Sequence, residues 1–229
     1  MIKQPGDQGC YATSGRILFM LQRGKNSSIP ISKRIMDLFL TILALLILSP
    51  VFLIVAILVI INFGTPIIFR QQRPGYNGKP FWVYKFRSMT NAHDAQDNLL
   101  PDSQRITRLG KFLRSYSLDE LPELFNILRG EMSLVGPRPL LMQYLGRYSP
   151  QQARRHDVLP GITGWAQING RNALTWKDKF ILDVWYVDHW SFWLDIKIIL
   201  LTIGKVLRRE GINQPGQATA EEFMGNDDP

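Results

Sequence analysis

The sequence is poor in the residues that hold soft metal ions. Cys10 is its single cysteine, and its three histidines, His93, His156 and His189, are scattered along 229 residues. One cysteine cannot form an intrachain disulfide, so nothing in the chain requires an oxidising compartment. Because there is no C-x-x-C pair and the histidines do not cluster, we do not expect a zinc site.

The common nucleotide-binding signatures are also missing. The chain contains neither G-x-G-x-x-G nor G-x-x-x-x-G-K-[ST], which excludes a Rossmann fingerprint and a P-loop as the means of holding phosphates. It has no internal repeat and no low-complexity tract. An apolar content of 45% excludes a disordered chain, and the length suits one domain with or without an appendage.

Positive charge, in contrast, is abundant. All 27 lysines and arginines lie at or before Arg209, and five of the 19 acidic residues follow it. The first 209 residues therefore carry a net charge of +13. A body this basic favours anionic partners, which are nucleic acid, membrane head groups or phosphorylated substrates.

One long apolar segment stands out near the N-terminus. Residues 38–61 contain no charge over 24 positions, which is long enough to span a bilayer. Ser49 and Pro50 divide the segment into 11 residues before and 11 after, and each half would rise roughly 16 Å, about half the hydrocarbon thickness. Proline breaks or kinks a helix, and a nearby serine can satisfy the freed backbone groups.

Basic residues flank this segment equally on both sides. Within 26 residues of its two ends, five cations precede it and five follow it: Arg16, Arg23, Lys25, Lys33 and Arg34, then Arg70, Arg73, Lys79, Lys85 and Arg87. The positive-inside rule needs an excess of cations on one side, and here there is none. The equal flanks favour a re-entrant hairpin with both ends in the cytoplasm over a kinked single span. Asp37, close to Lys33 and Arg34, is expected at the entry point in an interfacial ion pair.

The remaining segments read as a mixed, mostly helical fold. Residues 66–73 and 81–89 form a predicted β-hairpin around a Gly-rich turn, and 91–103 a polar loop. Residues 105–114 and 122–129 are predicted helices, the second ended by Gly130. Ser149 and Pro150 look like an N-cap followed by proline at the first helical position.

Tryptophan is concentrated towards the C-terminal end. Trp185, Trp190 and Trp193 are half of the six tryptophans and lie within nine residues. Tryptophan favours the level of the lipid head groups, so residues 183–209 are expected to form an amphipathic helix in the membrane interface. A core helix is the alternative, because aromatic side chains pack cores equally well.

Residues 115–126 read SYSLDELPELFN and place two carboxylates, Asp119 and Glu120, side by side. Neighbours on a helix do not face each other, so they are no facing acid–base pair. Ser117 and Glu120 fit a capping box, but Pro122 would then disturb the helix interior. If the helix instead starts at Pro122, both acids lie just outside it on exposed backbone. Helix capping and a chemical role for Asp119 and Glu120 therefore remain alternatives at this point.

Several cations could hold anions near this pair. Arg138 lies between two prolines, a stiff mounting for a bidentate phosphate contact. The glycine-punctuated loop 159–171 ends in Arg171. Lys85 and Arg87 interrupt an aromatic strand, and Arg114 comes just before the acidic pair. Their number around two carboxylates predicts a site that handles phosphates.

Six motifs in this order make the chain recognisable. They are Lys33-Arg34-x-x-Asp37; Ser49-Pro50; Tyr84-Lys85-Phe86-Arg87-Ser88-Met89; Ser117-Leu118-Asp119-Glu120-Leu121; Val135-Gly136-Pro137-Arg138-Pro139; and Pro160-Gly161-Ile162-Thr163-Gly164-Trp165. With them the chain resembles the bacterial sugar transferases, specifically the small monotopic phosphoglycosyl transferases. The resemblance runs from about Lys33 to about Arg209, and the tail at Gly225 and Asn226 is similar too.

The resemblance implies an enzyme that moves a sugar 1-phosphate from a UDP-sugar to polyprenyl (undecaprenyl) phosphate and releases UMP. In the family the aspartate of the acidic pair is the nucleophile that forms a covalent phosphosugar intermediate, and the glutamate is a Mg²⁺ ligand. Carried over, these are Asp119 and Glu120. Asp183 matches a further carboxylate of the family's site, without an assigned role, and Lys85, Arg87, Arg114, Arg138 and Arg171 are the expected substrate-binding cations.

These readings together give a four-part division of the chain. We expect an N-terminal extension of unassigned role (1–30), a re-entrant membrane helix (31–63), a catalytic domain with interfacial helices (64–209) and a polar tail (210–229). The expected fold class is α+β, mostly helical with a small β-hairpin. The expected location is the bacterial inner membrane with the active site on the cytoplasmic face, where anionic lipids and downstream glycosyltransferases are further partners.

Other functions remain to be weighed against this one. The absence of a large added domain favours an N-acetylated amino sugar by family analogy, and galactose or glucose phosphate is the alternative. A non-catalytic basic membrane scaffold would explain the charge and the apolar segment, but it has no use for Asp119 and Glu120. A nucleic-acid binder has no use for the apolar segment, and no nucleic-acid-binding motif is present. The oligomeric state is left open.

Overall fold

The computed structural model describes residues 29–170, 173–208 and 222–225. Nearly all of the expected N-terminal extension, together with Arg171 and most of the polar tail, lies outside these residues. Four clusters of buried apolar side chains hold the described part together. The fold is mostly helical with two small sheets, in agreement with the predicted α+β class.

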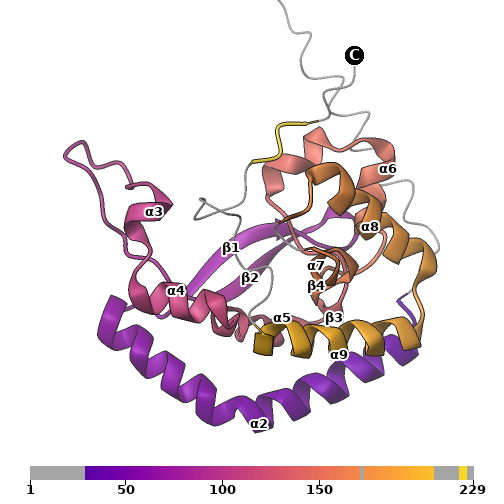
Figure 1. Ribbon diagram of the computed structural model, residues 1–229, viewed down its shortest axis with the longest axis horizontal. Coiled ribbons are helices and arrows are strands. Elements are labelled where there is room, and N and C mark those ends of the chain that lie inside the picture. Colours follow the sequence, from indigo (N-terminus) through magenta and orange to yellow (C-terminus); the bar gives the residue numbers. More distant parts are fainter. Residues whose placement is uncertain (1–28, 171–172, 209–221, 226–229) are drawn as a thin grey trace, which may run out of the picture.

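The apolar segment forms one helix, α2 (Ile31–Phe63), rather than two half-helices separated by a break. Pro50 lies inside it, and the helix is bent near its middle (Figure 1). Pro50 cannot donate to the Leu46 carbonyl oxygen, four residues earlier. The Ser49 hydroxyl donates to that oxygen instead, at 2.9 Å, so the predicted compensation by serine is confirmed. The helix is long and apolar enough to cross a membrane.

One face of the first turns of α2, which carries Lys33 and Asp37, is buried against the rest of the protein, contrary to the expected interfacial ion pair. Lys33 Nζ lies 2.6 Å from Asp195 Oδ2 and also donates to the Val135 carbonyl oxygen. Asp37 accepts from the Leu134 backbone N–H at 3.1 Å, and Arg34 donates to the last carbonyls of a neighbouring helix. Lys33 therefore pairs with Asp195 and not with Asp37, and these side chains join α2 to the rest of the domain.

The predicted hairpin is confirmed. β1 (Ile68–Pro74) pairs antiparallel with β2 (Pro80–Phe86) around the short 3₁₀ turn η1 (Tyr76–Gly78). Asn126 attaches this hairpin to helix α5 (Glu123–Arg129): its side chain donates to the Trp82 carbonyl oxygen and accepts from the Tyr84 N–H. Two short helices, α3 (Asp102–Arg105) and α4 (Arg108–Ser115), replace the single helix expected there.

A second, parallel pair of strands brings two of the recognised motifs together. β3 (Ser133–Val135) pairs with β4 (Gly161–Thr163), and their backbones approach closely. A Cβ atom on Gly161 would lie 2.1 Å from the Gly136 backbone N, and one on Gly136 would lie 2.3 Å from the Leu159 carbonyl oxygen. The glycines of the predicted anion-binding loop therefore permit this packing, which fixes the start of the Gly136–Arg138 segment.

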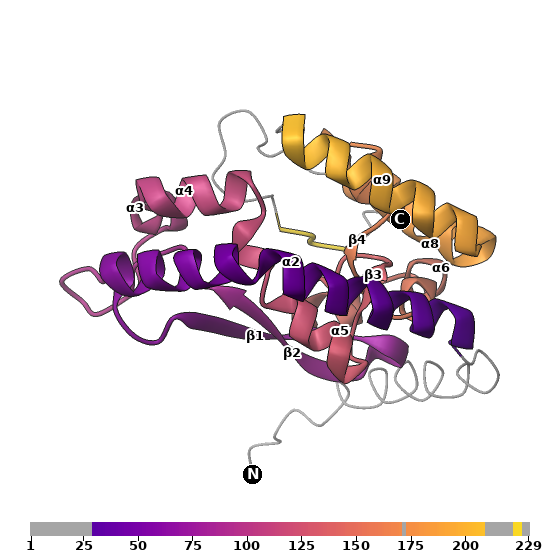
Figure 2. The ribbon, with the colours of Figure 1, turned by 90° about the horizontal axis from the view of Figure 1, so that it is seen from below.

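Apart from β4, the regular elements described after β3 are all helical. They are η3 (Met142–Arg147), α6 (Pro150–Ala153), η4 (Arg154–His156), α7 (Trp165–Ile168), α8 (Trp176–His189) and α9 (Phe192–Arg208). Ser149 caps α6 as predicted, with a complete capping box. Figures 1 and 2 show α2, α4 and α9 gathered around one end of the molecule.

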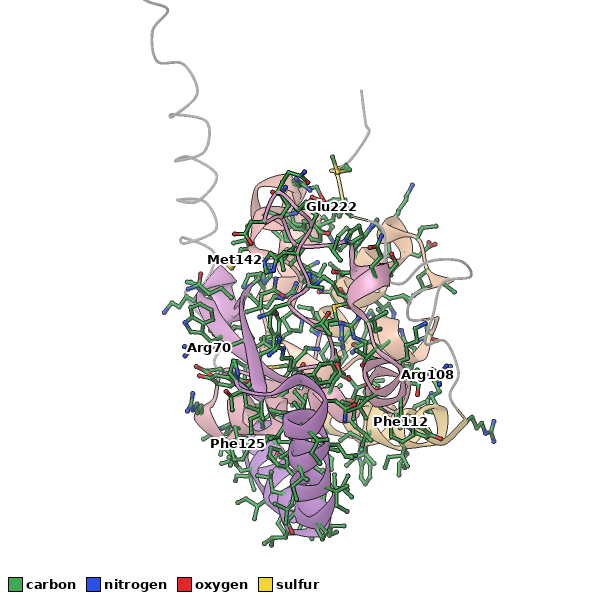
Figure 3. All side chains as sticks on the ribbon, turned by 90° about the vertical axis from the view of Figure 1, so that its left-hand side faces the viewer. Arg70, Arg108, Phe112, Phe125, Met142 and Glu222 are labelled. Carbon is green, nitrogen blue, oxygen red and sulfur yellow. The ribbon has the colours of Figure 1, made fainter. Side chains whose placement is uncertain are left out.

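The tryptophan-rich segment divides between α8 and α9 and is not the single helix expected. Trp190 is partly buried and donates to Asp195 at 3.0 Å, whereas Trp193 is 76% exposed. Exposed aromatic side chains also occur on α4 and α5: Phe112 and Phe125 lie near α2, at the opposite end from Met142 and Glu222 (Figure 3). The end of the molecule around α2 is thus rich in exposed apolar groups.

Candidate active site

The two adjacent acids lie on a short 3₁₀ turn, η2 (Leu118–Glu120), immediately before α5. Ser117 adopts a left-handed backbone conformation with φ of 55° and makes no capping hydrogen bond, so the capping-box prediction is wrong. Pro122 directly precedes the first residue of α5, close to the alternative placement. Asp119 and Glu120 are buried, which corrects the expectation that they lie on exposed backbone.

Glu120 is bound by two cations. Its Oε1 accepts from Lys85 Nζ at 2.8 Å and from Arg138 Nη2, while its Oε2 lies 3.5 Å from Arg138 Nη1. Burial alone would raise the pKa of Glu120, but the charges and hydrogen bonds of Arg138 and Lys85 hold it well below its ordinary value. Glu120 is therefore an anion at neutral pH, with one oxygen only weakly engaged.

A third carboxylate, Glu123, completes the anionic side of the site. Lys85 Nζ lies 2.9 Å from Glu123 Oε1 and thus bridges Glu120 and Glu123. Burial, reinforced by the charge of Glu120, raises the pKa of Glu123. Burial opposes the charge on Lys85, but Glu120 and Glu123 outweigh it and raise the pKa of the amine. Sequence reasoning missed Glu123, although it follows Asp119 by one helical turn.

Asp119 differs from both neighbours. Its carboxylate forms no hydrogen bond and no ion pair with any residue in the described ranges, although it is only 8% exposed. Burial, followed by the charge of Glu120, raises its pKa, and this rise is opposed by Lys85, Arg114 and Arg138. A carboxylate that is surrounded by cations but bonded to none keeps its lone pairs available for reaction.

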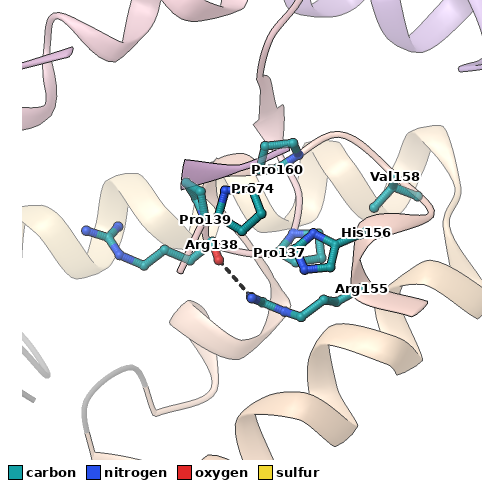
Figure 4. Close-up of a pocket in the computed structure, with 8 residues that line it drawn as sticks. All are labelled: Pro74, Pro137, Arg138, Pro139, Arg155, His156, Val158 and Pro160. Atoms are coloured by element: carbon teal, nitrogen blue, oxygen red, sulfur yellow. Dashed lines mark hydrogen bonds between the residues drawn. The ribbon is translucent and has the colours of Figure 1, made fainter. Parts of the chain in front are cut away.

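Arg138 is held from behind by a buried ion pair. Arg155 Nη2 donates to the Arg138 carbonyl oxygen at 2.7 Å (Figure 4). The same guanidinium donates to Asp183 Oδ2 at 2.8 Å from Nη2 and 3.1 Å from Nε. Asp183 is thus part of the support of the site and forms no direct contact with Asp119 or Glu120, while Arg155 was missed by sequence reasoning.

Comparison with known proteins decides the family. The family model described as bacterial sugar transferase matches residues 28–209. The chain belongs to the bacterial sugar transferase family. Asp119, Glu120, Lys85 and Arg138 all lie within the matched residues.

Individual relatives cover the chain to different extents. The uncharacterized sugar transferase EpsL of Bacillus subtilis (strain 168) is 56% identical over 198 residues, which are 86% of this chain and 98% of EpsL. The undecaprenyl-phosphate glucose phosphotransferase of Komagataeibacter xylinus is 46% identical over 76% of this chain but only 35% of its own length. The galactosyl transferase CpsE of Streptococcus agalactiae is 44% identical over 79% of this chain and 43% of its own length. Apart from EpsL, these relatives are therefore more than twice the length of the segment they share with this transferase.

The remaining predicted cations of this sugar transferase divide between the site and other roles. Arg114 lies beside the site, where its Nε donates to Ser88 Oγ at 3.0 Å. Arg87 instead donates to the carbonyl oxygens of Phe63 and Met89 and so terminates α2, which is a structural role. Arg171 lies outside the described residues.

One further cation was not predicted at the site. Burial and the charge of Arg138 lower the pKa of Arg73 to about 10, against a favourable effect of Glu123. Arg73 donates to Gln71 at 2.6 Å. Its position at the end of β1, beside Arg138, adds to the positive potential that an anionic substrate meets.

Proposed function

We propose that this transferase moves a sugar phosphate from a nucleoside diphosphate sugar to polyprenyl phosphate and releases the nucleoside monophosphate. The observation that carries the proposal is the Asp119 carboxylate, which has no hydrogen-bond or ion-pair partner among the described residues but is surrounded by Lys85, Arg114 and Arg138. Relatives named as undecaprenyl-phosphate glucose phosphotransferase and UDP-glucose:undecaprenyl-phosphate glucose-1-phosphate transferase support the same reaction class.

The first displacement uses Asp119 as the nucleophile. A carboxylate oxygen attacks the phosphorus that carries the sugar, an O–P bond forms, and the bond from that phosphorus to the bridging oxygen breaks. The nucleoside monophosphate leaves with the bonding pair. In the second displacement an oxygen of the lipid phosphate attacks the same phosphorus, and the Asp119 carboxylate leaves unchanged. A covalent intermediate divides one difficult transfer into two easier ones.

The cations make this chemistry accessible to a carboxylate. A diphosphate repels an anionic nucleophile, and Arg138, Arg114 and Lys85 offset that repulsion while stabilising charge that develops on the leaving group. Burial and the charge of Glu120 raise the pKa of Asp119, and a more basic carboxylate is a better nucleophile. Glu120 in turn keeps Lys85 and Arg138 in place through its two ion pairs.

The residues present fit a magnesium ion. Mg²⁺ in phosphate-transferring sites is bound by one or two carboxylates together with substrate phosphates. Glu120 is anionic, and its Oε2 has only one long contact, 3.5 Å to Arg138. Glu120 would hold the ion, which when bound supplies further neutralisation of the phosphate oxygens. The described residues contain no cluster of three or more metal-ligating side chains, so the remaining ligands would come from substrate and water.

The relatives with a named sugar guide the choice of donor. They are named for glucose or galactose, which favours a UDP-hexose over the N-acetylated amino sugar expected from the short chain. EpsL, whose length this chain matches, is named for no sugar. We therefore propose a UDP-sugar donor of the hexose class and keep the N-acetylated amino sugar as the alternative to be tested beside it.

The membrane placement that suits this reaction is monotopic. The bend of α2, the exposed apolar side chains along it and the basic flanks support a re-entrant helix in the bacterial inner membrane with the site on the cytoplasmic face. Exposed Trp193 and Phe112 support interfacial positions for α9 and α4. The basic surface supports binding to anionic lipids.

A UMP-release assay with the purified protein tests the proposal. UDP-glucose, UDP-galactose and a UDP-N-acetylhexosamine are each offered with Mg²⁺, with and without undecaprenyl phosphate. We expect sustained UMP release only with the lipid, and fastest with a hexose. A protein that binds anionic vesicles but releases no UMP from any donor would be a membrane scaffold and not a transferase.

A further inference from the structure

The last segment that the structure describes, residues 222–225, carries a buried aromatic side chain. Phe223 is the single aromatic residue of the expected polar tail, and it is only 3% exposed. Its backbone N–H donates to the Tyr144 hydroxyl at 3.2 Å, and its carbonyl oxygen accepts from Arg147. The Arg147 guanidinium also lies 2.8 Å from Glu222 Oε1. This part of the tail is therefore bound to the domain by backbone and side chain together.

Four aromatic rings surround Phe223. On α8, the ring centroids of Phe180 and Trp176 lie 4.9 Å and 5.6 Å from that of Phe223. The centroid of Tyr144, in η3, lies at 5.7 Å, and that of Tyr148, directly after η3, at 6.0 Å. These distances are typical of favourable aromatic pairs. Phe223 thus joins η3 and the residue after it to α8.

Two of the same rings also hold Arg155, which supports the active site. The Arg155 guanidinium lies 5.8 Å from the ring centroid of Tyr148 and 5.7 Å from that of Phe180. Its Nη1 donates to the Tyr148 hydroxyl at 3.3 Å. Since Arg155 is only 3% exposed, these two rings restrict the directions in which its guanidinium can point. Both rings pack on Phe223, so Phe223 helps to fix them.

We infer that Phe223 is a positioning residue for the transfer reaction and acts through Arg155 on Arg138. The inference rests on the proposed function. Phe223 holds two rings, these rings hold the Arg155 guanidinium, and the guanidinium donates to the Arg138 carbonyl oxygen at 2.7 Å. Arg138 in turn forms an ion pair with Glu120. A tail that leaves its place would therefore loosen the arginine that offsets the charge of the substrate phosphates.

Phe223→Leu is the first test, because leucine keeps an apolar side chain in the cluster but loses the ring contacts. We expect kcat to fall roughly 10-fold through misplacement of Arg138, with the KM for UDP-sugar within about twofold of wild type. Met224→Leu changes the neighbouring side chain, which is 75% exposed, and this matched control should have the kcat of wild type. Steady-state UMP release gives both constants, and thermal unfolding shows that each variant is folded.

A double-mutant cycle separates positioning from a general loss of stability. Arg155→Lys removes the planar group through which Phe223 acts. In that background Phe223→Leu should lower kcat less than about twofold, because the connection is already broken. In an Arg114→Gln background the two losses should multiply, because Arg114 belongs to α4 and is held by Ser88.

Tyr148→Phe tests the same connection without a change of packing. It removes only the hydroxyl that accepts from Arg155 and keeps the ring that packs on Phe223. We expect kcat to fall about 3 to 10-fold while the unfolding temperature stays close to that of wild type. This variant also decides the matter if Phe223→Leu does not fold.

Three results would overturn the inference. A folded Phe223→Leu protein keeps the kcat of wild type, or Tyr148→Phe does. Alternatively, the losses from Phe223→Leu and Arg155→Lys multiply as they do with Arg114→Gln, because Phe223 would then only stabilise the fold. A wild-type protein that releases no UMP from any UDP-sugar would refute the proposed function itself, and that outcome is distinct from all three.

Discussion

Asp183 and Arg138 do not touch, yet a single side chain joins them. The Arg155 guanidinium donates twice to Asp183 Oδ2 and once to the Arg138 carbonyl oxygen. Arg155 and Asp183 are both nearly inaccessible to solvent. The backbone of Arg138 is thereby held through its carbonyl oxygen while its side chain contacts Glu120, and we expect Asp183 to act as a positioning residue.

Arg155→Lys should show whether Arg155 positions Arg138 for catalysis or only stabilises the fold. Lysine keeps the charge but lacks the planar fork that reaches Asp183 and the Arg138 carbonyl together. We expect kcat to fall by roughly 10 to 100-fold through misplacement of Arg138, with little change in the KM for UDP-sugar. Steady-state UMP release gives both constants, and a lower kcat accompanied by a proportionally higher KM would contradict this role.

The neighbouring arginine provides the control. Arg154 pairs with Asp188, with Nη1 3.1 Å from Oδ2, but this pair is exposed. Exposed ion pairs contribute about 0 to 1 kcal/mol, whereas removing one partner of a buried pair costs about 3 to 5 kcal/mol. Arg154→Lys should therefore leave the thermal unfolding temperature and kcat unchanged. A loss equal to that of Arg155→Lys would show that the substitution acts through a general effect.

Local patterns predicted much of the fold. The hairpin, the N-cap at Ser149 and the end of α5 at Gly130 all depend on residues a few positions apart, and such signals can be recognised in a single sequence. The hydrogen bond from Ser49 to the Leu46 carbonyl oxygen, which replaces the one that Pro50 cannot donate, is also a local feature. The helix at 105–114 was misplaced because Ile106 leaves the helical conformation between α3 and α4.

Long-range pairing could not be read in the same way. Lys33 meets Asp195, 162 positions away, instead of the nearby Asp37. The choice is made by how α2 packs on β3 and α9, which no local pattern encodes. Arg155 and Arg87 illustrate the same difficulty. Arg155 supports the site from η4, and Arg87, although only two residues from Lys85 in the same motif, donates to the Phe63 carbonyl oxygen at the end of α2.

Replacing Pro50 tests the membrane topology. Pro50→Ala restores the donor to the Leu46 carbonyl and permits a straight apolar helix of about 36 Å, long enough to cross the bilayer. Wild-type chains should have both termini in the cytoplasm, and a fraction of the Pro50→Ala chains should span. The single cysteine, Cys10, reports the N-terminus through a membrane-impermeant maleimide applied to intact cells.

The C-terminus needs a second reporter. Pro229→Cys in a Cys10→Ser background serves that purpose. Labelling of wild-type Cys10 from outside the cell would replace the re-entrant arrangement with a span. Ser49→Ala is the milder comparison, since it removes the hydroxyl that satisfies Leu46 but keeps the proline, and we expect it to leave the topology unchanged.

His156 should make stability sensitive to mild acid. Burial, and then the charge of Arg155, lower the pKa of His156 to about 3, while the unfolded value is near 6.5. Below pH 6.5 protonation favours the unfolded chain, so the contribution of neutral His156 is complete above that pH and is lost as pH falls. Between pH 6.5 and 5 we expect a loss of about 2 kcal/mol from this residue.

Thermal unfolding at pH 7 and pH 5 checks this expectation. His156→Gln cannot be protonated, so it should show a smaller decrease in unfolding temperature over the interval than wild type. His189→Gln, at an exposed position, is the matched control and should behave like wild type. Equal decreases in all three proteins would place the acid sensitivity elsewhere.

Glu120→Gln tests the metal ligand. The amide loses the charge that holds Lys85 and Arg138 and the oxygen offered to Mg²⁺, so we expect kcat to fall at least 100-fold, a fall of the size seen when one stabilising group is removed. Part of the loss should be recovered at raised Mg²⁺. Glu123→Gln, which also removes a partner of Lys85, should lose activity without a changed Mg²⁺ dependence. Unchanged activity of Glu120→Gln, with and without chelator, would remove Glu120 from the metal site.

Asp119→Asn distinguishes a nucleophile from a helix-end residue most directly. Since burial raises the pKa of Asp119 and no described residue pairs with it, the ionised carboxylate destabilises the fold at neutral pH. Asparagine removes that charge, so its unfolding temperature should equal or exceed that of wild type. Turnover should nevertheless be abolished with UDP-sugar still bound, because a neutral amide does not attack phosphorus.

The intermediate itself gives the decisive measurement. Wild-type protein given UDP-sugar without polyprenyl phosphate should release at most one equivalent of UMP in a burst. Intact-protein mass spectrometry of that mixture should show a sugar-phosphate adduct, and digestion should locate it on the peptide that contains Asp119. The Asp119→Asn protein should show neither burst nor adduct. An adduct on another residue, or an Asn variant with near-normal turnover, would reassign the nucleophile, because Asp119 would then contribute only charge to a site whose reacting group lies elsewhere.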